Sequence, residues 1–318
     1  MTAHKLLIAS DLHYCHNLAA ETAANCDRLP PDTYDHRVDG RLFWHNEMLV
    51  EEMDGMLDAL LALTAREEPD LVVFLGDLVN TNWRENVAHV GRRLAEFPCP
   101  VEVVTGNHDI YLADPAGRVQ DFTAPGAYQT GCRHQQVGDF GLLFIDLFVR
   151  YEDGAYAKWL DVTGAAGDVG YRPQDVEAAL QHLADHAEVP HLLLGHFPMC
   201  TPEERLRQPG RRIGWSWPDG RPLAERLAAP GNLAGIVAGH QHFAHFQAFA
   251  GGFHWTVPPL VEYPCAAAIL ELAPGHVSGR LVQPRPALAQ KSLAVRGEVW
   301  PFGAPADREF AWAIERPH

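Results

Sequence analysis

The sequence predicts an α/β protein in which apolar strands alternate with amphipathic helices. Five short apolar runs, rich in β-branched residues and leucine, indicate buried strands at residues 6–10, 71–75, 101–104, 191–194 and 233–238. Helical spacing of apolar residues between these runs predicts helices at 47–65, 84–97, 173–186 and 223–227. The order strand, loop, helix, strand, helix, strand in the N-terminal part builds a largely parallel sheet.

The later part of the chain predicts a second sheet. Two apolar runs around the turn at 138–141 predict a hairpin within 137–148, and residues 243–282 alternate and turn like strands that close this second sheet. We place a main domain at residues 1–284, with insertions near 14–46, 151–171 and 201–222. The aromatic and cationic first insertion favours a cap over the substrate. Residues 285–318 form a predicted C-terminal arm that wraps the core or contacts a second subunit.

The composition and net charge of the chain limit the kinds of partner that it can bind. The chain has 318 residues, 47% of them hydrophobic, which is ample for a core. The 25 basic and 41 acidic residues give a formal net charge of -16, which disfavours a nucleic-acid polymer as partner. A small anionic substrate remains compatible with this charge, because bound metal cations can dominate the local potential.

The N-terminus and the cysteines favour a cytoplasmic protein without membrane association. The first residues enter a strand directly, without the features of a signal peptide, and no run approaches the roughly 20 apolar residues of a spanning helix. No CxxC pair occurs, which favours free thiols over a disulfide framework. The six cysteines are Cys15, Cys26, Cys99, Cys132, Cys200 and Cys265.

Polar residues follow each predicted strand at its carboxyl end, where α/β sheets place their ligand sites. The five blocks are Asp11-Leu12-His13, Gly76-Asp77, Gly106-Asn107-His108-Asp109, Gly195-His196 and Gly239-His240-Gln241-His242. Taken singly, each residue could be a helix cap, a turn residue or an ordinary histidine. Their coincidence at five strand ends instead favours two adjacent sites for hard metal ions. The candidate ligands are Asp11, His13, Asp77, Asn107, His196, His240 and His242, with Asp77 as the natural bridge.

These five blocks, in this order, resemble the calcineurin-like metallophosphoesterase superfamily. The resemblance extends over roughly residues 5–282 and implies a four-layer α/β/β/α sandwich of two mixed sheets with helices on the outer faces. It implies that Asp11, His13 and His242 hold a first metal, that Asn107, His196 and His240 hold a second, and that Asp77 bridges them. The ions implied are divalent or mixed-valence Mn, Fe or Zn. The gap between Asp11 and Asp77 is longer than in many members, which leaves the substrate open.

By this resemblance, a hydroxide that bridges the metals attacks phosphorus, His108 acts as general acid, and Asp109 orients or polarises His108. We expect hydrolysis of a small phosphodiester. A phosphomonoesterase acting on a nucleotide or sugar phosphate and a non-catalytic metal-binding scaffold remain alternatives. A metallo-β-lactamase-like hydrolase is rejected, because Ala244 stands where its HxHxDH ligand run needs aspartate. The expected partners are a small phosphate ester and a second copy of the chain, the latter through the C-terminal arm.

Overall fold

The computed structural model describes residues 3–16, 49–80, 83–110, 131–146, 173–200, 220–249, 251–297 and 299–314. It also gives the backbone of short paired strands in or next to the predicted insertions: β2 (His36–Val38) with β3 (Arg41–Phe43), β9 (Tyr151–Glu152) with β10 (Ala155–Tyr156), and β8 (Phe148–Val149) with β11 (Val169–Gly170). The remainder of the predicted insertions at 14–46, 151–171 and 201–222 lies largely outside the described residues, and so does the predicted substrate cap.

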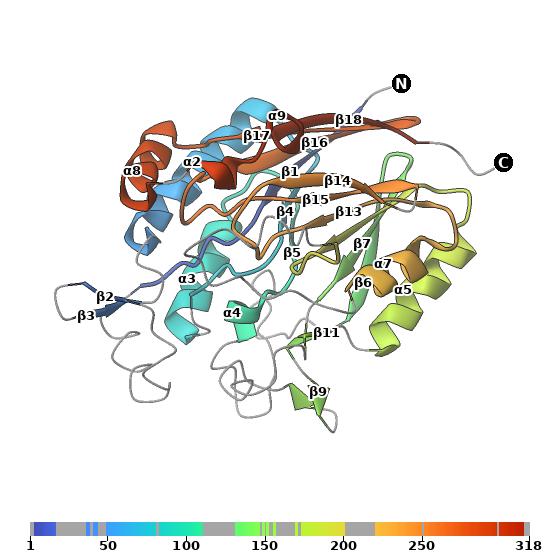
Figure 1. Ribbon diagram of the computed structural model, residues 1–318, viewed down its shortest axis with the longest axis horizontal. Coiled ribbons are helices and arrows are strands. Elements are labelled where there is room, and N and C mark those ends of the chain that lie inside the picture. Colours follow the sequence, from blue (N-terminus) through green and yellow to red (C-terminus); the bar gives the residue numbers. More distant parts are fainter. Residues whose placement is uncertain are drawn as a thin grey trace.

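The first sheet has six strands in the order β18-β17-β16-β1-β4-β5 (Figure 1). Its parallel half consists of β1 (His4–Ala9), β4 (Leu71–Phe74) and β5 (Val101–Val103). Its antiparallel half consists of β16 (Ala267–Ala273), β17 (His276–Val282) and β18 (Glu309–Ala313). Since β1, β4 and β5 are adjacent and parallel, their carboxyl ends meet at one edge of the sheet.

The second sheet also has six strands, in the order β14-β15-β13-β12-β7-β6. Its parallel strands are β7 (Phe140–Ile145), β12 (His191–Gly195), β13 (Leu233–Ala238) and β15 (Gly252–Thr256). The outer strands β6 (Cys132–Val137) and β14 (His245–Phe249) are antiparallel to their neighbours. The predicted hairpin is present as β6 and β7, which turn through Gly138 and Asp139, but its first strand lies before the predicted range of 137–148.

Strand alternation divides the core into three layers of side chains, because successive residues face opposite sides of a sheet. In β1, Leu6 and Ile8 point between the two sheets, whereas Leu7 and Ala9 point toward the helices on the outer face. In β12, Leu192 and Leu194 likewise face the inter-sheet core, whereas Leu193 faces the opposite helical layer. This confirms the four-layer α/β/β/α sandwich.

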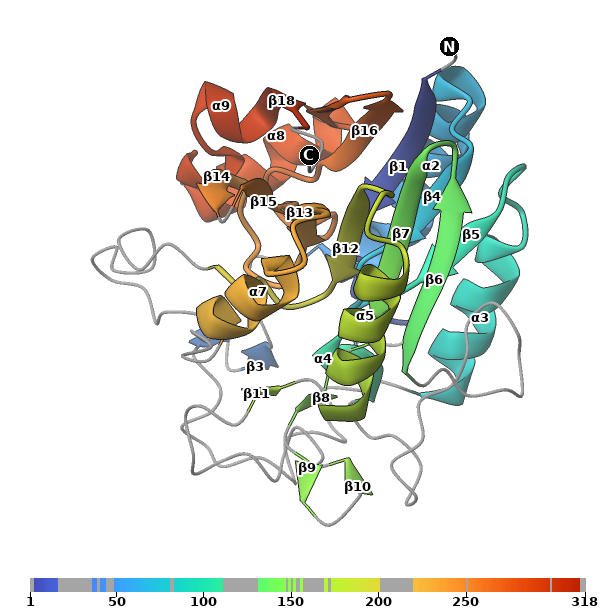
Figure 2. The same ribbon diagram turned by 90° about the vertical axis from the view of Figure 1, so that its right-hand side faces the viewer.

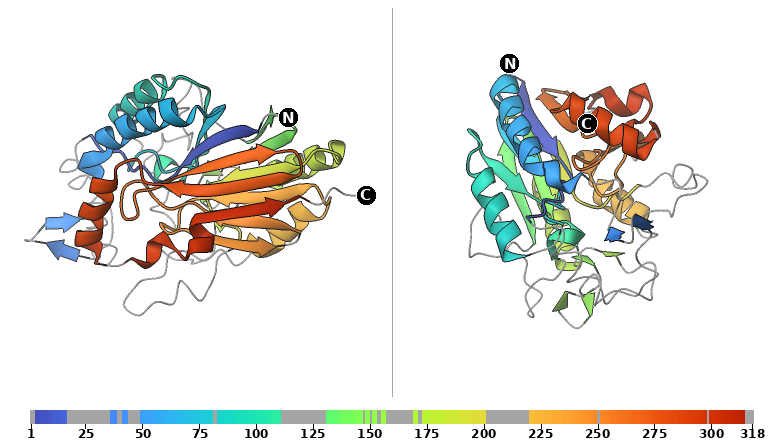
Figure 3. Two further views of the ribbon diagram at one scale, coloured as in Figure 1. Left: turned by 90° about the horizontal axis from the view of Figure 1, so that it is seen from above. Right: turned by 90° about the vertical axis from the view of Figure 1, so that its left-hand side faces the viewer.

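Helices cover both outer faces (Figures 2 and 3). On the first sheet lie α2 (Met53–Glu67), preceded by the 3-10 turn η2 (Val50–Glu52), and α3 (Arg84–Leu94). On the second sheet lie α5 (Pro173–Asp185) and α7 (Gly220–Ala228). In α2 the residues Met53, Met56, Leu57 and Leu60 form one fully buried stripe, which is the spacing that predicted this helix.

The strands near the C-terminus are placed differently from the prediction. Only the first part of residues 243–282 belongs to the second sheet, as β14 and β15. The strands β16 and β17 instead join the first sheet, where β16 pairs with β1 from Ile8 opposite Ala268 to His4 opposite Leu272. The strands of both sheets bury one face in the same inter-sheet core, so alternation alone does not reveal which sheet a strand joins.

The C-terminal residues pack on their own chain. The helix α8 (Pro286–Arg296) contributes Leu288 and Ala289 to the outer core of the first sheet. It is followed by the 3-10 turn η4 (Trp300–Phe302), the short helix α9 (Pro305–Arg308) and the edge strand β18. Contact with a second subunit through this region stays a prediction.

Among the described residues, no helix has the length and apolar character needed to cross a membrane. Among the described cysteines, Cys99, Cys132 and Cys200 are free thiols as predicted.

Candidate metal centre

The five predicted strand ends meet at one place. The amide of Asp11 donates to the carbonyl of Gly76 at 3.1 Å, and that of His13 donates to the carbonyl of Asp77 at 2.8 Å, which joins the ends of β1 and β4. The two sheets are joined there as well, because the amide of His240 donates to Oδ2 of Asp11 at 3.0 Å. All seven predicted ligands are brought together by these contacts and those described below.

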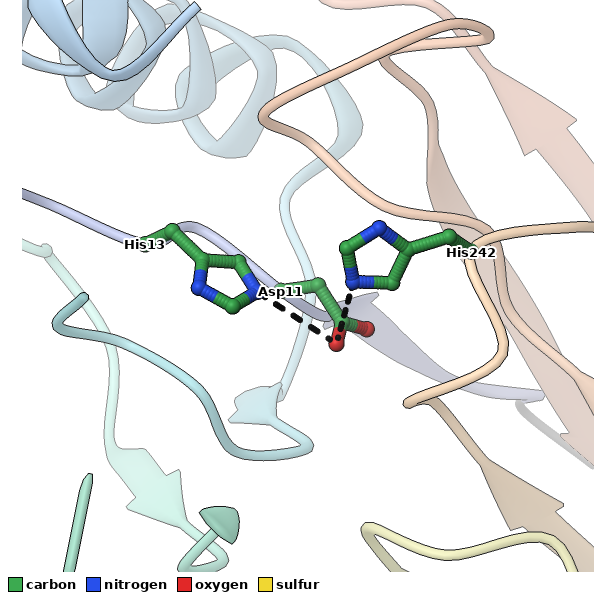
Figure 4. A group of neighbouring side chains, drawn as sticks. All are labelled: Asp11, His13 and His242. Carbon is green, nitrogen blue, oxygen red and sulfur yellow. Dashed lines mark ion pairs between the residues drawn. The ribbon is translucent and has the colours of Figure 1, made fainter. Parts of the chain in front are cut away.

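A first donor group consists of Asp11, His13 and His242, whose ligand atoms lie within 4.8 Å of one another (Figure 4). Oδ1 of Asp11 is 3.2 Å from Nε2 of His242 and 3.9 Å from Nε2 of His13. This oxygen is completely buried and makes no hydrogen bond within the described part of the chain. Buried carboxylate oxygens in a protein core normally accept hydrogen bonds. A buried oxygen that instead faces two imidazole nitrogens is better explained as part of a cation-binding site.

A second donor group is formed by Asp77, His196 and His240. Nε2 of His196 lies 3.3 Å from Oδ2 of Asp77, 3.1 Å from Oδ1 of Asn107 and 3.2 Å from Nδ1 of His240. Nδ1 of His196 donates to the carbonyl of Leu75 at 2.7 Å, which directs Nε2 at the other donors. On its other side, the ring of His240 stacks on Phe197 with the ring centroids 3.7 Å apart.

Asp77 stands between the two groups. Its Oδ2 is 3.3 Å from His196 and 3.6 Å from Nε2 of His13, so one carboxylate oxygen faces histidines of both groups. Its Oδ1 accepts the backbone amide of His108 at 2.8 Å. This placement is the one that a bridging ligand requires.

Backbone conformation at the centre is unusual. Seven non-glycine residues in the described part of the chain have a positive φ, and five of them are predicted ligands: Asp11, His13, Asp77, His240 and His242. Left-handed backbone is uncommon for such residues and is concentrated at functional sites. Gly106 leaves the room for Asp77, because a Cβ there would lie 2.2 Å from Oδ1 of Asp77. The glycine of the Gly-Asn-His-Asp block is therefore required for steric reasons, because any side chain at this position would collide with Asp77.

The charges of the centre depend on one another. Burial opposes ionisation of Asp77, but His196 and His108 outweigh it and hold the pKa of Asp77 well below its usual range. Burial opposes the charge of His196 too, yet Asp77 raises its pKa to about 9. Against the same burial effect, Asp11 and Glu262 raise the pKa of His242 to about 10. Burial and His196 together lower the pKa of His240 well below its usual range. Cation binding must therefore displace protons from His196 and His242.

The two predicted catalytic residues have different surroundings. His108 is buried beside His13, with ring centroids 4.5 Å apart, and its Nδ1 donates to the carbonyl of Asn80 at 2.8 Å. Asp109 accepts the amides of Leu78 and Gly106, each at 2.9 Å, and so ties together the loops after β4 and β5. Burial and the Asp77 charge raise the pKa of Asp109 to about 7. Its predicted effect on His108 stays a prediction.

Several residues around the centre were missed by the sequence reasoning. Arg133 donates to Oδ2 of Asp146 at 2.6 Å and to the carbonyl of Val103 at 2.6 Å, and Asp146 accepts the amide of Thr105 at 3.0 Å. This ion pair fixes the end of β5 to the β6–β7 hairpin. Glu262, whose Oε1 lies 2.7 Å from Nδ1 of His242, was also missed. Neither Asp146 nor Glu262 lies in a recognisable motif.

The sequence model of the calcineurin-like phosphoesterase family matches residues 4–244. The chain belongs to the calcineurin-like phosphoesterase family. A comparison with curated proteins finds no match. Among solved structures, this calcineurin-like phosphoesterase is similar to a dimetal phosphatase from Danio rerio, with 14% identity, a TM-score of 0.56, and coverage of 89% of this chain and 96% of that one. It is also similar to the purple acid phosphatase PPD1 from yellow lupin (Lupinus luteus) seeds, with 11% identity, a TM-score of 0.55, and coverage of 99% and 54%.

These structural similarities show the fold, and the donor set of this chain supports a dinuclear centre independently. Carboxylate, imidazole and carboxamide donors suit Mn, Fe or Zn, and no thiolate is among the donors of the two groups described. Asp11, His13 and His242 would hold one ion; Asn107, His196 and His240 would hold the other; Asp77 would contact both. As a calcineurin-like phosphoesterase with this centre, the protein is a metal-dependent phosphoesterase.

Proposed function

We propose that this phosphoesterase hydrolyses a small phosphodiester. The observation that carries the proposal is the position of Asp77 Oδ2, which lies within 3.6 Å of histidines from both donor groups and so allows two cations to share one carboxylate. When bound, two such ions supply the nucleophile and the positive charge that the transferred phosphoryl group needs. The chain's own residues orient the ester and move the proton.

We assign the general acid role to His108. Its amide is held by Asp77 and its Nδ1 by the carbonyl of Asn80, so both ends of the residue are fixed relative to the donors. Since Nδ1 carries the proton donated to Asn80, Nε2 is the nitrogen that would deliver a proton to the leaving oxygen. Asp109 stabilises the two loops on which Asp77 and His108 lie, and we retain its polarising effect on His108 as a proposal.

Charge supports a small diester over other phosphate esters. A diester carries one negative charge and a monoester close to two, so the formal charge of -16 opposes the diester less. The same charge opposes a nucleic-acid polymer, whose binding needs a basic surface.

The free thiols support our proposal that the protein is cytoplasmic.

The test compares two chromogenic substrates on one preparation. The Mn²⁺-loaded protein is assayed with bis-p-nitrophenyl phosphate and with p-nitrophenyl phosphate, and kcat/KM is measured for each. We expect a higher value for the diester. Asp77→Asn should abolish both activities, whereas Asp139→Asn, a control in the exposed β6–β7 turn, should change neither.

Two results would contradict the proposal in different ways. A large preference for the monoester would leave a phosphomonoesterase acting on a nucleotide or sugar phosphate. No hydrolysis of either ester with Mn²⁺, Zn²⁺ or Fe²⁺, although two ions bind, would leave the non-catalytic scaffold.

A further inference from the structure

The side chain of His242 is held from behind by a buried carboxylate. Nδ1 of His242 lies 2.7 Å from Oε1 of Glu262, and the Glu262 side chain is only 7% exposed. An ionised carboxylate only accepts hydrogen bonds, so Nδ1 must carry the proton. Nε2, which lies 3.2 Å from Oδ1 of Asp11, is then the nitrogen that faces the first donor group.

We propose that Glu262 is a positioning residue for the first metal ion, an inference that rests on the dinuclear centre of the proposed function. Glu262 selects the Nδ1-protonated tautomer of His242, fixes the ring plane, and increases the basicity of Nε2. Carboxylates that accept from a ligating histidine act in this way at metal sites generally, and their loss weakens metal binding by about 10–100-fold.

The backbone around Glu262 is bound to the same donor group that its side chain supports. The amide of Leu260 donates to the carbonyl of Ser10 at 3.0 Å, and the amide of Val261 donates to the carbonyl of Asp11 at 3.2 Å. Glu262 therefore follows directly on two hydrogen bonds to the segment that carries a ligand. This one loop therefore holds Asp11 through its backbone and His242 through the side chain of Glu262.

The loop is in turn supported by the C-terminal part of the chain. The amide of Tyr263 donates to Oγ of Ser292 on α8 at 2.6 Å, and Ser292 is completely buried. The side-chain amide of Gln283 donates to the carbonyl of Pro264 at 2.9 Å. Glu262, Gln283 and Ser292 all lie beyond residue 244, where the match to the family model ends. The first metal site thus draws on residues outside the part of the chain that carries the family's blocks.

Charge separates this role from simple packing. Glutamine has nearly the shape of glutamate and can still accept from Nδ1, but it has no charge to raise the basicity of the imidazole. A purely structural Glu262 would therefore tolerate Glu262→Gln. A positioning residue would lose metal affinity in Glu262→Gln and lose more in Glu262→Ala.

The experiment measures Zn²⁺ binding by competition with a chromophoric chelator. We expect the wild-type protein to bind two Zn²⁺ ions with separate dissociation constants. Glu262→Gln should raise one of the two by about tenfold and Glu262→Ala by about 100-fold, while the other changes less than threefold. Glu271→Gln, a half-buried glutamate on β16, serves as the matched control and should change neither constant.

Two further measurements keep the inference open to refutation if the Glu262 variants fold poorly. Ser292→Ala leaves the carboxylate in place but removes the acceptor for Tyr263, and it should weaken the same Zn²⁺ site by a smaller factor. Long-range ¹H–¹⁵N spectra of the Zn²⁺-loaded wild-type protein should show His242 as the Nδ1-protonated tautomer.

The outcomes separate the inference from the proposed function. A Glu262→Ala protein that folds and binds both Zn²⁺ ions within threefold of wild type overturns the role of Glu262 and leaves the dinuclear centre intact. So does an Nε2-protonated His242 in a wild-type protein holding two ions. A wild-type protein that binds fewer than two Zn²⁺ ions overturns both.

Discussion

The backbone amide of His108 donates a hydrogen bond to Oδ1 of Asp77 across 2.8 Å. The residue proposed to protonate the leaving group is therefore attached to the carboxylate proposed to bridge the ions. Because Oδ2 of the same carboxylate faces His13 and His196, a displacement of Asp77 would disturb both donor groups and His108 together.

Asp77→Asn should therefore weaken metal binding at both sites. Asparagine can still accept the His108 amide, but the charge that attracts two cations is lost. We expect the protein to retain at most one tightly bound Mn²⁺ and to lose more than about 1000-fold in kcat, since the dinuclear arrangement is gone. Metal content after gel filtration checks the first expectation and steady-state kinetics the second. Retention of two ions would contradict the bridging assignment.

His108→Gln should separate proton transfer from metal binding. Glutamine cannot act as an acid, so kcat for an ester with a poorly acidic leaving alcohol should fall by about 100-fold or more while both ions remain bound. The loss should be largest for esters with a poorly acidic leaving alcohol and small for p-nitrophenolate, which leaves without protonation. Equal losses across a series of leaving groups would count against His108 as the acid.

Gly106→Ala tests the steric origin of the glycine in the third block. The added Cβ would lie 2.2 Å from Oδ1 and 2.4 Å from the amide nitrogen of Asp77, so Asp77 must shift. We expect metal affinity to fall by at least about tenfold at both sites, because a small displacement of a ligand is enough to weaken coordination. Isothermal titration with Zn²⁺ is the measurement. Unchanged affinity at both sites would show that the loop adapts.

Asp146→Ala should destabilise the fold rather than remove a catalytic group. It leaves Arg133 and the amide of Thr105 without a buried acceptor, and such losses typically cost about 2–4 kcal/mol in the free energy of unfolding. Urea unfolding of the metal-free protein measures this cost. Asp139→Asn, in the turn at the opposite end of β7, is the control and should stay within about 0.5 kcal/mol of wild type.

Two buried histidines away from the metal centre should make the protein sensitive to acid. Burial lowers the pKa of His191 to about 4 and that of His254 to about 3. Their pKa in the unfolded chain is about 6.5, so below this pH these two side chains bind more protons in the unfolded state than in the folded state. Their contribution to stability should therefore fall as the pH decreases from about 6.5 toward 4.

The measurement is denaturant unfolding of the metal-free protein at a series of pH values. His254→Leu should reduce the slope of stability against pH by up to about 1.4 kcal/mol per pH unit in this range, the contribution of one proton. His276→Gln, at the first residue of β17, is the control. A slope that is the same in wild type and His254→Leu would exclude His254 as a cause of acid sensitivity.

Sequence patterns predicted what depends on local chemistry. The apolar runs identified the central strands of both sheets, and the polar residues after them identified a set of donors that the structure brings together. Asp77, for example, follows β4 directly, and the carboxyl end of a parallel strand is where such a residue has to lie if it serves a site.

Contacts between distant segments were not predictable in this way. Glu262 contacts His242 because the chain crosses from β15 in the second sheet to β16 in the first, whereas the alternation in residues 243–282 predicts both strands in the same sheet. Arg133 and Asp146 form their pair because β6 and β7 lie beside the end of β5. A single glutamate or arginine in a strand or loop carries no local signal of a partner that tertiary packing supplies.

The left-handed backbone at Asp11, His13, Asp77, His240 and His242 bears on how such a centre evolves. Each of these positions costs the fold on the order of 1 kcal/mol, which glycine would relieve. Substitutions that stabilise the metal-free protein would therefore replace the donors one by one. A lineage that no longer needed the ions would gain stability by losing these residues. Keeping aspartate and histidine there requires continued selection for ion capture.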